Sequence, residues 1–378
     1  MLDYTTLRII WWALLGLLLI GFAIMDGFDL GAAAITPLVA RNDLQRRIVM
    51  NALGPVWEGN QVWLILGAGA LFAAWPSIYA VSFSGFYLAM FLVLSALIIR
   101  PVSFKFRSKN DGATWRRVWD SLFWFSGIVP CLVFGVAVGN VLQGAPFHFD
   151  DVLRAVYTGG FWALFTPFTL LCGVLSVSML CMHGAAYLNM KTQGEVQHRA
   201  RKTLWVFALL TLVLFALGGY WVAMDLPGYV ITSKVLTAGP SNPMHKHVVM
   251  QIGAWIENYY VYHWALIAPM LGFIGALGAI FLSVLKFEKT AFISSCAAVF
   301  GVVSTVGVSM FPFILPSSTN PSQSLLVWDA SSSELTLKIM LVATIIFLPI
   351  ILLYTGWVYR VMRGKVTAES VNDDMQSY

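Results

Sequence analysis

Two aspartates inside a long apolar segment are the residues of this sequence best suited to chemistry. The segment spans about residues 7–36 and carries Asp26 and Asp29 near its end. Because these residues are three apart, their side chains lie on one face of a helix. A carboxylate inside a membrane costs roughly 2.5–3.5 kcal/mol on insertion scales, so a pair needs a polar path or a buried partner. The alternative is that both lie at the water boundary and only end the helix.

Further charged groups are expected at the same depth. The second apolar segment begins with Trp57 and Glu58, and the third ends at Arg100. Consecutive helices with short connections are usually neighbours, so these groups are expected beside the two aspartates. One arginine cannot neutralise three carboxylates, which leaves an acid able to take a proton near neutral pH. The sequence therefore predicts a proton relay that contains Asp26, Asp29, Glu58 and Arg100, with Trp57 as apolar cover.

The composition decides which elements must position these groups. Of 378 residues, 59% are hydrophobic and 11% are charged, whereas soluble domains carry about 25% charged residues. This excludes a soluble enzyme and predicts an all-α integral membrane protein with a single polytopic domain, residues 1–378. Gly27 and Gly31 form a small-xxx-small step that predicts a close helix contact. The nine expected transmembrane helices cover about residues 7–36, 57–75, 78–99, 119–142, 161–182, 204–222, 261–285, 291–314 and 335–358.

The distribution of basic residues predicts the orientation. Lys and Arg accumulate in cytoplasmic loops, and 18 of the 23 follow the first, third, fifth, seventh or ninth segment. The N-terminus is therefore expected in the periplasm and the C-terminus in the cytoplasm. The first segment is expected to be retained and not cleaved as a signal peptide. Nucleic acid is not needed to explain these charges.

Two outer features have local signals of their own. The connection at residues 225–260 is longer than most, so it is expected to fold over the surface or meet a partner. Ser331 and Glu334 have the spacing of a helix capping box ahead of the last apolar segment.

Ligands for a cofactor or metal are not evident in the sequence. A haem between helices needs a His or Met deep in a span, but His183 and His263 fall at segment ends and the other histidines fall in loops. The four cysteines lie in apolar segments without paired spacing, so no zinc site is expected.

Several long motifs in order resemble subunit II of a cytochrome bd-type quinol oxidase. The resemblance covers essentially the whole chain, and within the family the sequence looks closest to the enterobacterial bd-II isoform. The motifs are GFDLG at 27–31, WEGNQVWLI at 57–65, ALFAAWPSIYA at 70–80, FSGFY at 83–87, RPVSFKFRSK at 100–109, GNVLQG at 139–144, MFPFILPSS at 310–318 and WDASSSELTL at 328–337.

The resemblance implies a role in a respiratory complex of the bacterial inner membrane. The complex would oxidise ubiquinol or menaquinol, reduce O2 to water and generate proton motive force by vectorial chemistry. Haem b558, haem b595 and haem d would be ligated by subunit I, so no catalytic residue is expected in this chain. Subunit II would support haem assembly, could hold a structural ubiquinone or menaquinone, and would contact membrane lipid and a small single-helix subunit. Its fold would be two four-helix bundles plus one peripheral helix.

The resemblance also assigns residues to a cytoplasmic proton-uptake path. The path residues of the family correspond to Asp29, Glu58 and Arg100, with Trp57 alongside. Position 58 departs from the pattern, because many relatives have Asp where this chain has Glu. Two alternatives stay open: a proton-coupled secondary transporter, which would use the same intramembrane acids, and a purely structural scaffold.

Overall fold

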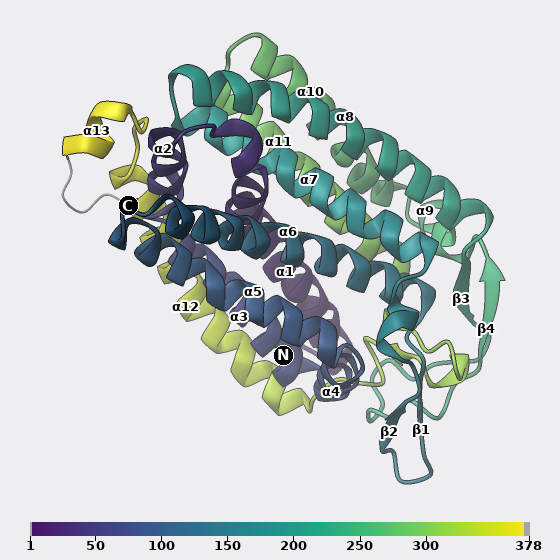
Figure 1. Cartoon of the computed structure of the whole chain (residues 1–378). Coiled ribbons are helices and arrows are strands. Elements are labelled where there is room, and N and C mark those ends of the chain that lie inside the picture. Colours follow the sequence, from purple (N-terminus) through teal and green to yellow (C-terminus); the bar gives the residue numbers. More distant parts are fainter. Residues whose placement is uncertain (1, 374–378) are drawn as a thin grey trace.

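The computed structural model describes residues 2–373, and most of them are helical (Figure 1). In this described part of the chain, eight helices are long and apolar enough to cross a membrane. The expectation of a membrane protein built mainly of helices is therefore confirmed, although three small sheets are also present. The eight are α1 (Tyr4–Val39), α5 (Tyr87–Phe106), α6 (Ala113–Gln143), α7 (Pro167–Lys191), α8 (Gly194–Met224), α10 (Ile267–Val284), α11 (Glu288–Met310) and α12 (Glu334–Val361).

The second expected helix is present but is not one of the eight. It is α3 (Trp57–Ala74), and its first two turns carry Glu58, Asn60 and Gln61, which lower its mean hydropathy. The total of nine spans and the orientation of the termini remain predictions.

The helices expected to end at residues 36 and 99 continue through the prolines that follow those positions. Pro37 lies inside α1, which continues to Val39, and Pro101 lies inside α5. A proline removes one backbone hydrogen bond, but the residues after Pro101 are held by the bundle. Ser103 and Phe104 are fully buried, and the Ser103 hydroxyl donates to the Ile99 carbonyl at 2.9 Å.

Other expected helix boundaries were wrong because a helix can extend beyond an apolar segment or break inside it. The expected helix at 78–99 is split at Phe86 into α4 (Pro76–Gly85) and α5. α6 and α8 begin several residues early, since charged turns outside the membrane also form helix. Residues 161–164 form the 3-10 helix η2 (Phe161–Leu164), and α7 begins only after the Thr166 cap. Past α11, Pro312 and Pro316 exclude helix, and β5 (Phe313–Leu315) forms there.

One end of the helix bundle is closed by three small antiparallel sheets. In Figure 1 the labelled strands lie at the opposite end from α2 (Asp43–Leu53) and α13 (Ala368–Asp373). The long connection at 225–260 forms a hairpin in which Pro227 pairs with Ile252 and Ile231 with Val248. It therefore folds over this end as expected. The sheets are β1 (Phe147–Phe149) with β2 (Ala155–Tyr157), β3 (Pro227–Ile231) with β4 (Val248–Ile252), and β5 with β6 (Leu325–Leu326).

Short helical turns fill the remaining connections. They are η1 (Arg107–Lys109), η3 (Ala254–Ile256), α9 (Glu257–Val261), η4 (His263–Leu266) and η5 (Pro321–Gln323).

The cap of the last helix differs from the expected capping box. The N-cap of α12 is Ser333, whose hydroxyl accepts from the Thr336 backbone N–H. Ser331 is buried instead and accepts a hydrogen bond from Arg8 Nε at 2.7 Å. The S-x-x-E spacing was misleading because the helix starts two residues later and Arg8, far away in sequence, binds Ser331.

α1 lies at the centre of the molecule and joins two groups of helices. It contacts α3 and α6, and α5 packs on α6; α7, α8, α10 and α11 form the second group, which α1 meets through α7 and α11. α12 lies at the edge, where only Leu337 of its described side chains is buried.

The contact between α1 and α7 depends on glycine. A Cβ on Gly31 would overlap the carbonyl group of Leu180, and a Cβ on Gly27 would lie 2.8 Å from a Leu180 methyl. The predicted close contact is therefore confirmed, and it sets α1 at the depth and rotation that the two aspartates require.

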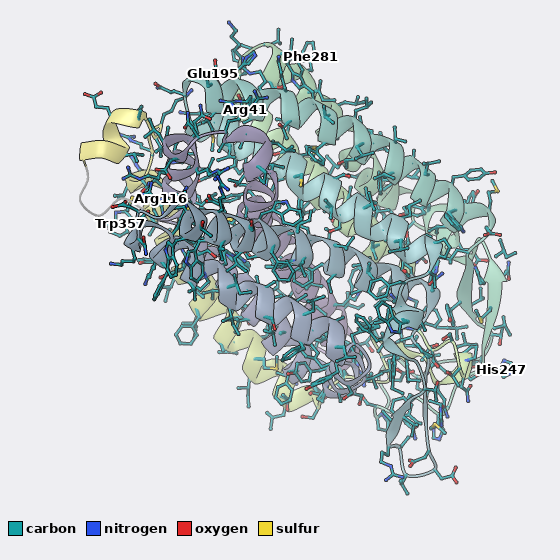
Figure 2. The ribbon with its side chains drawn as sticks, in the orientation of Figure 1. Arg41, Arg116, Glu195, His247, Phe281 and Trp357 are labelled. Atoms are coloured by element: carbon teal, nitrogen blue, oxygen red, sulfur yellow. The ribbon has the colours of Figure 1, made fainter. Side chains whose placement is uncertain are left out.

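Side chains labelled in Figure 2 mark the two ends of the bundle. Arg41, Arg116 and Glu195 lie at the end that holds α2, whereas His247 lies beside the β3–β4 hairpin.

Candidate functional site

A buried ion pair joins the first helix to the fifth. Arg100 donates to both carboxylate oxygens of Asp26, at 2.5 Å from Nη1 and 3.0 Å from Nη2. Both side chains are fully buried, with 1% and 0% exposed. A bidentate ion pair of this kind neutralises both charges and fixes the relative geometry of the two side chains. Asp26 and Arg100 are therefore held as a unit.

The second carboxylate has a different partner. Asp29 Oδ2 accepts from Asn60 Nδ2 at 2.7 Å, and Asn60 Oδ1 accepts from the Tyr359 phenol at 2.8 Å. Asp29 and Asn60 are each 1% exposed. The chain of contacts therefore runs from α1 through α3 to the last turns of α12. No cation lies within ion-pair distance of Asp29 among the described residues.

Three buried polar atoms beside these contacts have no hydrogen-bond partner within residues 2–373. They are Asp29 Oδ1, Arg100 Nε and Trp57 Nε1. Buried polar atoms are nearly always paired, so a group of orphans needs an explanation. They are one acceptor and two donors, and water is the usual partner of such buried atoms.

Trp57 and Glu58 are adjacent on α3, but the first side chain is buried and the second is exposed. Trp57 is buried and stacks on Phe104 of α5, with ring centroids 5.5 Å apart. Glu58 is exposed, and no ion pair joins it to Arg100 within the described residues. Helical residues turn about 100° each, so Trp57 and Asn60 share a face while Glu58 points away from it. The structure thus brings Asp26, Asp29, Arg100 and Trp57 together, and Glu58 stays outside.

Two members of the cluster were missed from the sequence. Asn60 follows Glu58 closely, but its inward direction depends on the rotation of α3. Tyr359 is 299 residues away and lies among aromatic and basic residues that end a span. Only the polar pattern around Asn60 could have drawn attention to it; Tyr359 has no local signal.

The one fully buried histidine of the described chain is His183, on α7. Its Nδ1 lies 2.8 Å from Ser295 Oγ and its Nε2 lies 2.8 Å from the Ile24 carbonyl. The ring also stacks on Phe292. Both ring nitrogens are thus used in protein hydrogen bonds, so this histidine does not fit the role of an axial haem ligand. The sequence placed it at a segment end, whereas it lies in the core.

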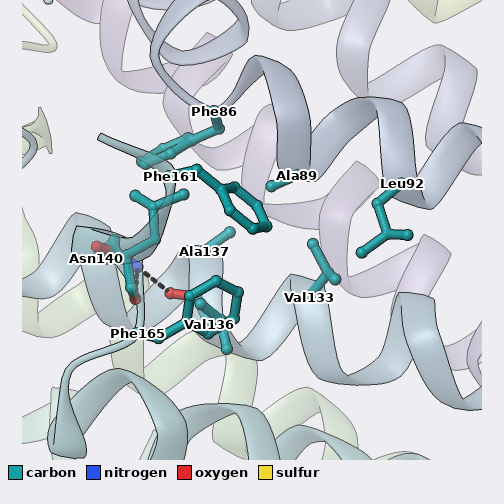
Figure 3. A pocket seen from close by; sticks show the side chains of 10 residues that line it. Phe86, Ala89, Leu92, Val133, Val136, Ala137, Asn140, Phe161 and Phe165 are labelled. Carbon is teal, nitrogen blue, oxygen red and sulfur yellow. Dashed lines mark hydrogen bonds between the residues drawn. The ribbon is translucent and has the colours of Figure 1, made fainter. Parts of the chain in front are cut away.

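An apolar slot lies between α5, α6 and η2 (Figure 3). Phe86, Phe161 and Phe165 line it, and the Asn140 amide at its edge donates to the Val136 and Leu164 carbonyls. Its volume is about 20 Å³. Ligand pockets are typically of the order of 300–1,000 Å³, so the slot does not fit a quinone ring. Within residues 2–373, no group of three or more His, Cys, Asp or Glu could hold a metal ion.

Comparisons with known proteins agree with one another. The family model for cytochrome bd terminal oxidase subunit II matches residues 7–362. The chain is 48% identical to the probable cytochrome oxidase subunit 2 of Haemophilus influenzae and 48% identical to the cytochrome bd-I ubiquinol oxidase subunit 2 of Escherichia coli K12, with 100% of each chain covered. It is 30% identical to the cytochrome bd ubiquinol oxidase subunit 2 of Bacillus subtilis, over 96% of this chain and 97% of that one.

A solved structure shows the same fold. The bd oxidase from Geobacillus thermodenitrificans matches with a TM-score of 0.69 at 18% identity, over 94% of this chain and 98% of that chain.

Proposed function

Because the chain belongs to the cytochrome bd terminal oxidase subunit II family, we propose that it provides a proton-uptake path to an oxidase whose haems lie in subunit I. Membership makes it a multi-pass bacterial inner-membrane subunit of a haem-containing oxidoreductase complex with a subunit I partner. The proposal adds that the complex oxidises ubiquinol or menaquinol, reduces O2 to water and generates proton motive force by vectorial chemistry.

The haem assignment is supported by His183. Because both of its ring nitrogens have protein partners, this chain offers no buried histidine free for iron among the described residues. Haem b558, haem b595 and haem d are therefore assigned to subunit I, where they supply the electron transfer and oxygen chemistry. The role proposed for this chain is to support their assembly and to deliver protons.

The different partners of the two aspartates are the observation that carries the proton path. Asp26 is neutralised by Arg100, whereas Asp29 is buried with one amide partner and a free oxygen. A relay acid must both take and give a proton, and a carboxylate locked to arginine does so poorly. Asp29 is therefore the relay group, and the Asp26–Arg100 pair shapes its field.

Glu58 suits the start of this path. An uptake path needs an acid in contact with water and a second acid behind it. Glu58 is exposed in the first turn of α3, and Asn60 on the same helix contacts Asp29. We assign Glu58 to proton collection and Trp57 to the apolar wall beside the path.

The remaining partners follow from the family and the surface. The exposed apolar side chains of α12, such as Ile345 and Leu353, suit membrane lipid. A small single-helix subunit and a structural quinone are also proposed. The slot near Phe161 is too small to be the quinone site, so that ligand has no place assigned here. The bd-II isoform likewise stays a prediction.

The test is Asp29→Asn in the purified complex, with oxygen uptake measured on a reduced quinol and normalised to haem d. We expect normal haem content and a loss of turnover of about a hundredfold or more, since proton transfer groups contribute roughly 10²–10⁴-fold. Asp111→Asn is the matched control, because its side chain is 98% exposed. Normal turnover per haem d in Asp29→Asn would overturn the proposed path.

A further inference from the structure

We infer that Tyr359 is a positioning residue for Asp29: through the Asn60 amide it holds one oxygen of Asp29 and leaves the other as the site of proton exchange. This inference deepens the proposed function and rests on it. It introduces α12, the peripheral helix, as part of the proton path.

The chemistry of the three groups allows one arrangement when Asp29 is ionised. A carboxylate only accepts hydrogen bonds, so the amide must turn its NH2 group toward Asp29 Oδ2. The amide oxygen then faces away, and the Tyr359 hydroxyl donates to it at 2.8 Å. Without the phenol, no other group within residues 2–373 donates a hydrogen bond to Asn60 Oδ1, and the amide could rotate.

The hydrogen-bonded chain from Tyr359 through Asn60 to Asp29, called the lock below, also determines which oxygen of Asp29 exchanges protons. A carboxamide neither gains nor loses a proton near neutral pH, so Asn60 cannot pass one from Tyr359 to Asp29. Proton exchange is thereby confined to Asp29 Oδ1, which has no protein partner within the described residues. Arg100 Nε and Trp57 Nε1 are buried donors that likewise have no partner within residues 2–373. In this inference Asp29 Oδ2 is fixed by the Asn60 amide, and Asp29 Oδ1 is the oxygen that exchanges protons.

The C-terminal end of α12, close to Tyr359, is fixed by hydrogen bonds to α7. Only Leu337 of its described side chains is buried, so packing alone holds the helix weakly. Beyond Tyr359, the Lys191 ammonium donates to the Met362 carbonyl at 2.6 Å, and Val366 N–H donates to the Lys191 carbonyl at 2.7 Å. The chain that follows α12 is therefore tied to α7, and the tie keeps the Tyr359 phenol within reach of Asn60.

The titratable and charged groups near Asp29 come from several of the helices packed around it. They are Asp26 on α1, Arg100 on α5, Tyr187 on α7 and Tyr359 on α12, with Cys131 on α6 facing the Asp26–Arg100 pair. Among these, Tyr359 is joined to Asp29 through an amide and not directly. Removing its hydroxyl changes the hydrogen bonding of Asp29 without adding or removing a charge.

The test is the pH profile of turnover per haem d in the intact complex carrying Tyr359→Phe. Loss of the lock weakens the hydrogen bond to ionised Asp29, so the profile should shift to higher pH. Turnover at neutral pH should fall about fivefold, as expected for one hydrogen bond. Asn60→Leu should shift the profile in the same direction. Tyr354→Phe is the matched control on α12, because that side chain is 65% exposed and should change nothing.

Three outcomes would contradict the role of Tyr359 or the proton path on which it rests. Unchanged profiles in Tyr359→Phe and Asn60→Leu, together with an inactive Asp29→Asn, would overturn the lock and leave the proposed path intact. Loss of haem d in Tyr359→Phe but not in Tyr354→Phe would make Tyr359 a structural anchor and would also overturn the inference. A normal Asp29→Asn enzyme would remove the proton path itself.

Discussion

Asp26 and Asp29 lie on the same face of one helix, yet their surroundings differ. Arg100 holds both oxygens of Asp26, while a neutral amide holds one oxygen of Asp29. Two identical side chains in one buried site thus have different partners, and the partner matters because a nearby cation favours the ionised form whereas burial disfavours it. At the scale of the residue, the partner decides the function.

Glu58 provides the first prediction at this scale. Its side chain is exposed and the Arg100 guanidinium is already paired with Asp26, so Glu58→Gln should leave assembly and haem content unchanged. Turnover per haem d should fall, because an amide cannot relay protons. Glu58→Asp should retain most activity, since a water can bridge the shorter reach. Haem loss in Glu58→Gln would instead identify a structural anchor, and full turnover would exclude an essential relay.

At the scale of the element, the placement of the site depends on how closely α1 approaches α7. Gly31 faces the backbone of Leu180, and Gly184 of α7 faces the backbone of α1 at Ala32. Neither helix can move aside without changing the position of Asp29, which lies two residues before Gly31.

Gly31→Ala should therefore disrupt the complex more than its single methyl group suggests. Overpacking usually costs about 1–3 kcal/mol, and here the new methyl meets backbone, which cannot rotate away. We expect less haem d in membranes and a lower thermal unfolding temperature. Gly16→Ala on the same helix is the control, because nothing lies within 4 Å of a Cβ at that position. Equal behaviour of the two variants would contradict the close-contact argument.

The end of the molecule that carries the sheets contains a buried ion pair that should respond to pH. Lys246 Nζ lies 2.6 Å from Asp329 Oδ2, and both side chains are almost fully buried. Burial lowers the pKa of Lys246 and raises the pKa of Asp329, while each charge opposes the shift of the other. An acid whose pKa is raised on folding stabilises the fold most at low pH, and this contribution is lost as pH rises above the unfolded value of 3.8.

Lys246→Met leaves Asp329 buried without its cation. The free energy of unfolding should then fall by about 3–5 kcal/mol at pH 8, and by less at pH 5, where the carboxyl is more easily protonated. Thermal unfolding of the complex at the two pH values measures the difference. Lys234→Met is the exposed control, and Lys246→Met combined with Asp329→Leu should recover most of the loss. A deficit that grows toward low pH would contradict this sign.

At the scale of the whole molecule, the two ends of the bundle are chemically distinct. One end carries the sheets and the long hairpin, and the other carries α2, α13 and most of the basic residues. The relay cluster connects to the second end through Tyr359 and the segment that follows α12. This agrees with a path that opens to the cytoplasm.

Reporter fusions test that orientation. Fusions after Lys109, Arg201 and Lys365 should be active only for a cytoplasmic reporter, and a fusion near Ser241 only for a periplasmic one. A periplasmic signal at Lys109 would invert the molecule and place the path on the wrong side. Quinol-driven oxygen uptake by the same purified complex separates the oxidase from the proton-coupled transporter, which would show none.

The sequence by itself determined the class of protein, the presence of most of its helices, the close glycine contact and the presence of buried acids, but not several of the helix boundaries. Hydropathy, charge placement and small-residue spacing are local properties, so they can be read without knowing the fold. Asp26, Asp29 and Arg100 were identified in this way, because ionisable residues in apolar segments are rare enough to notice.

Only the tertiary structure decided which groups meet. The rotation of α3 directs Asn60 inward and Glu58 outward, and a sequence cannot reveal that rotation when most of the helix is apolar. Tyr359 reaches Asn60 from 299 residues away, and Arg8 takes Ser331 away from the helix cap. Each of these contacts depends on helix packing across the whole chain, and packing is set by the sum of many weak contacts that no local pattern records.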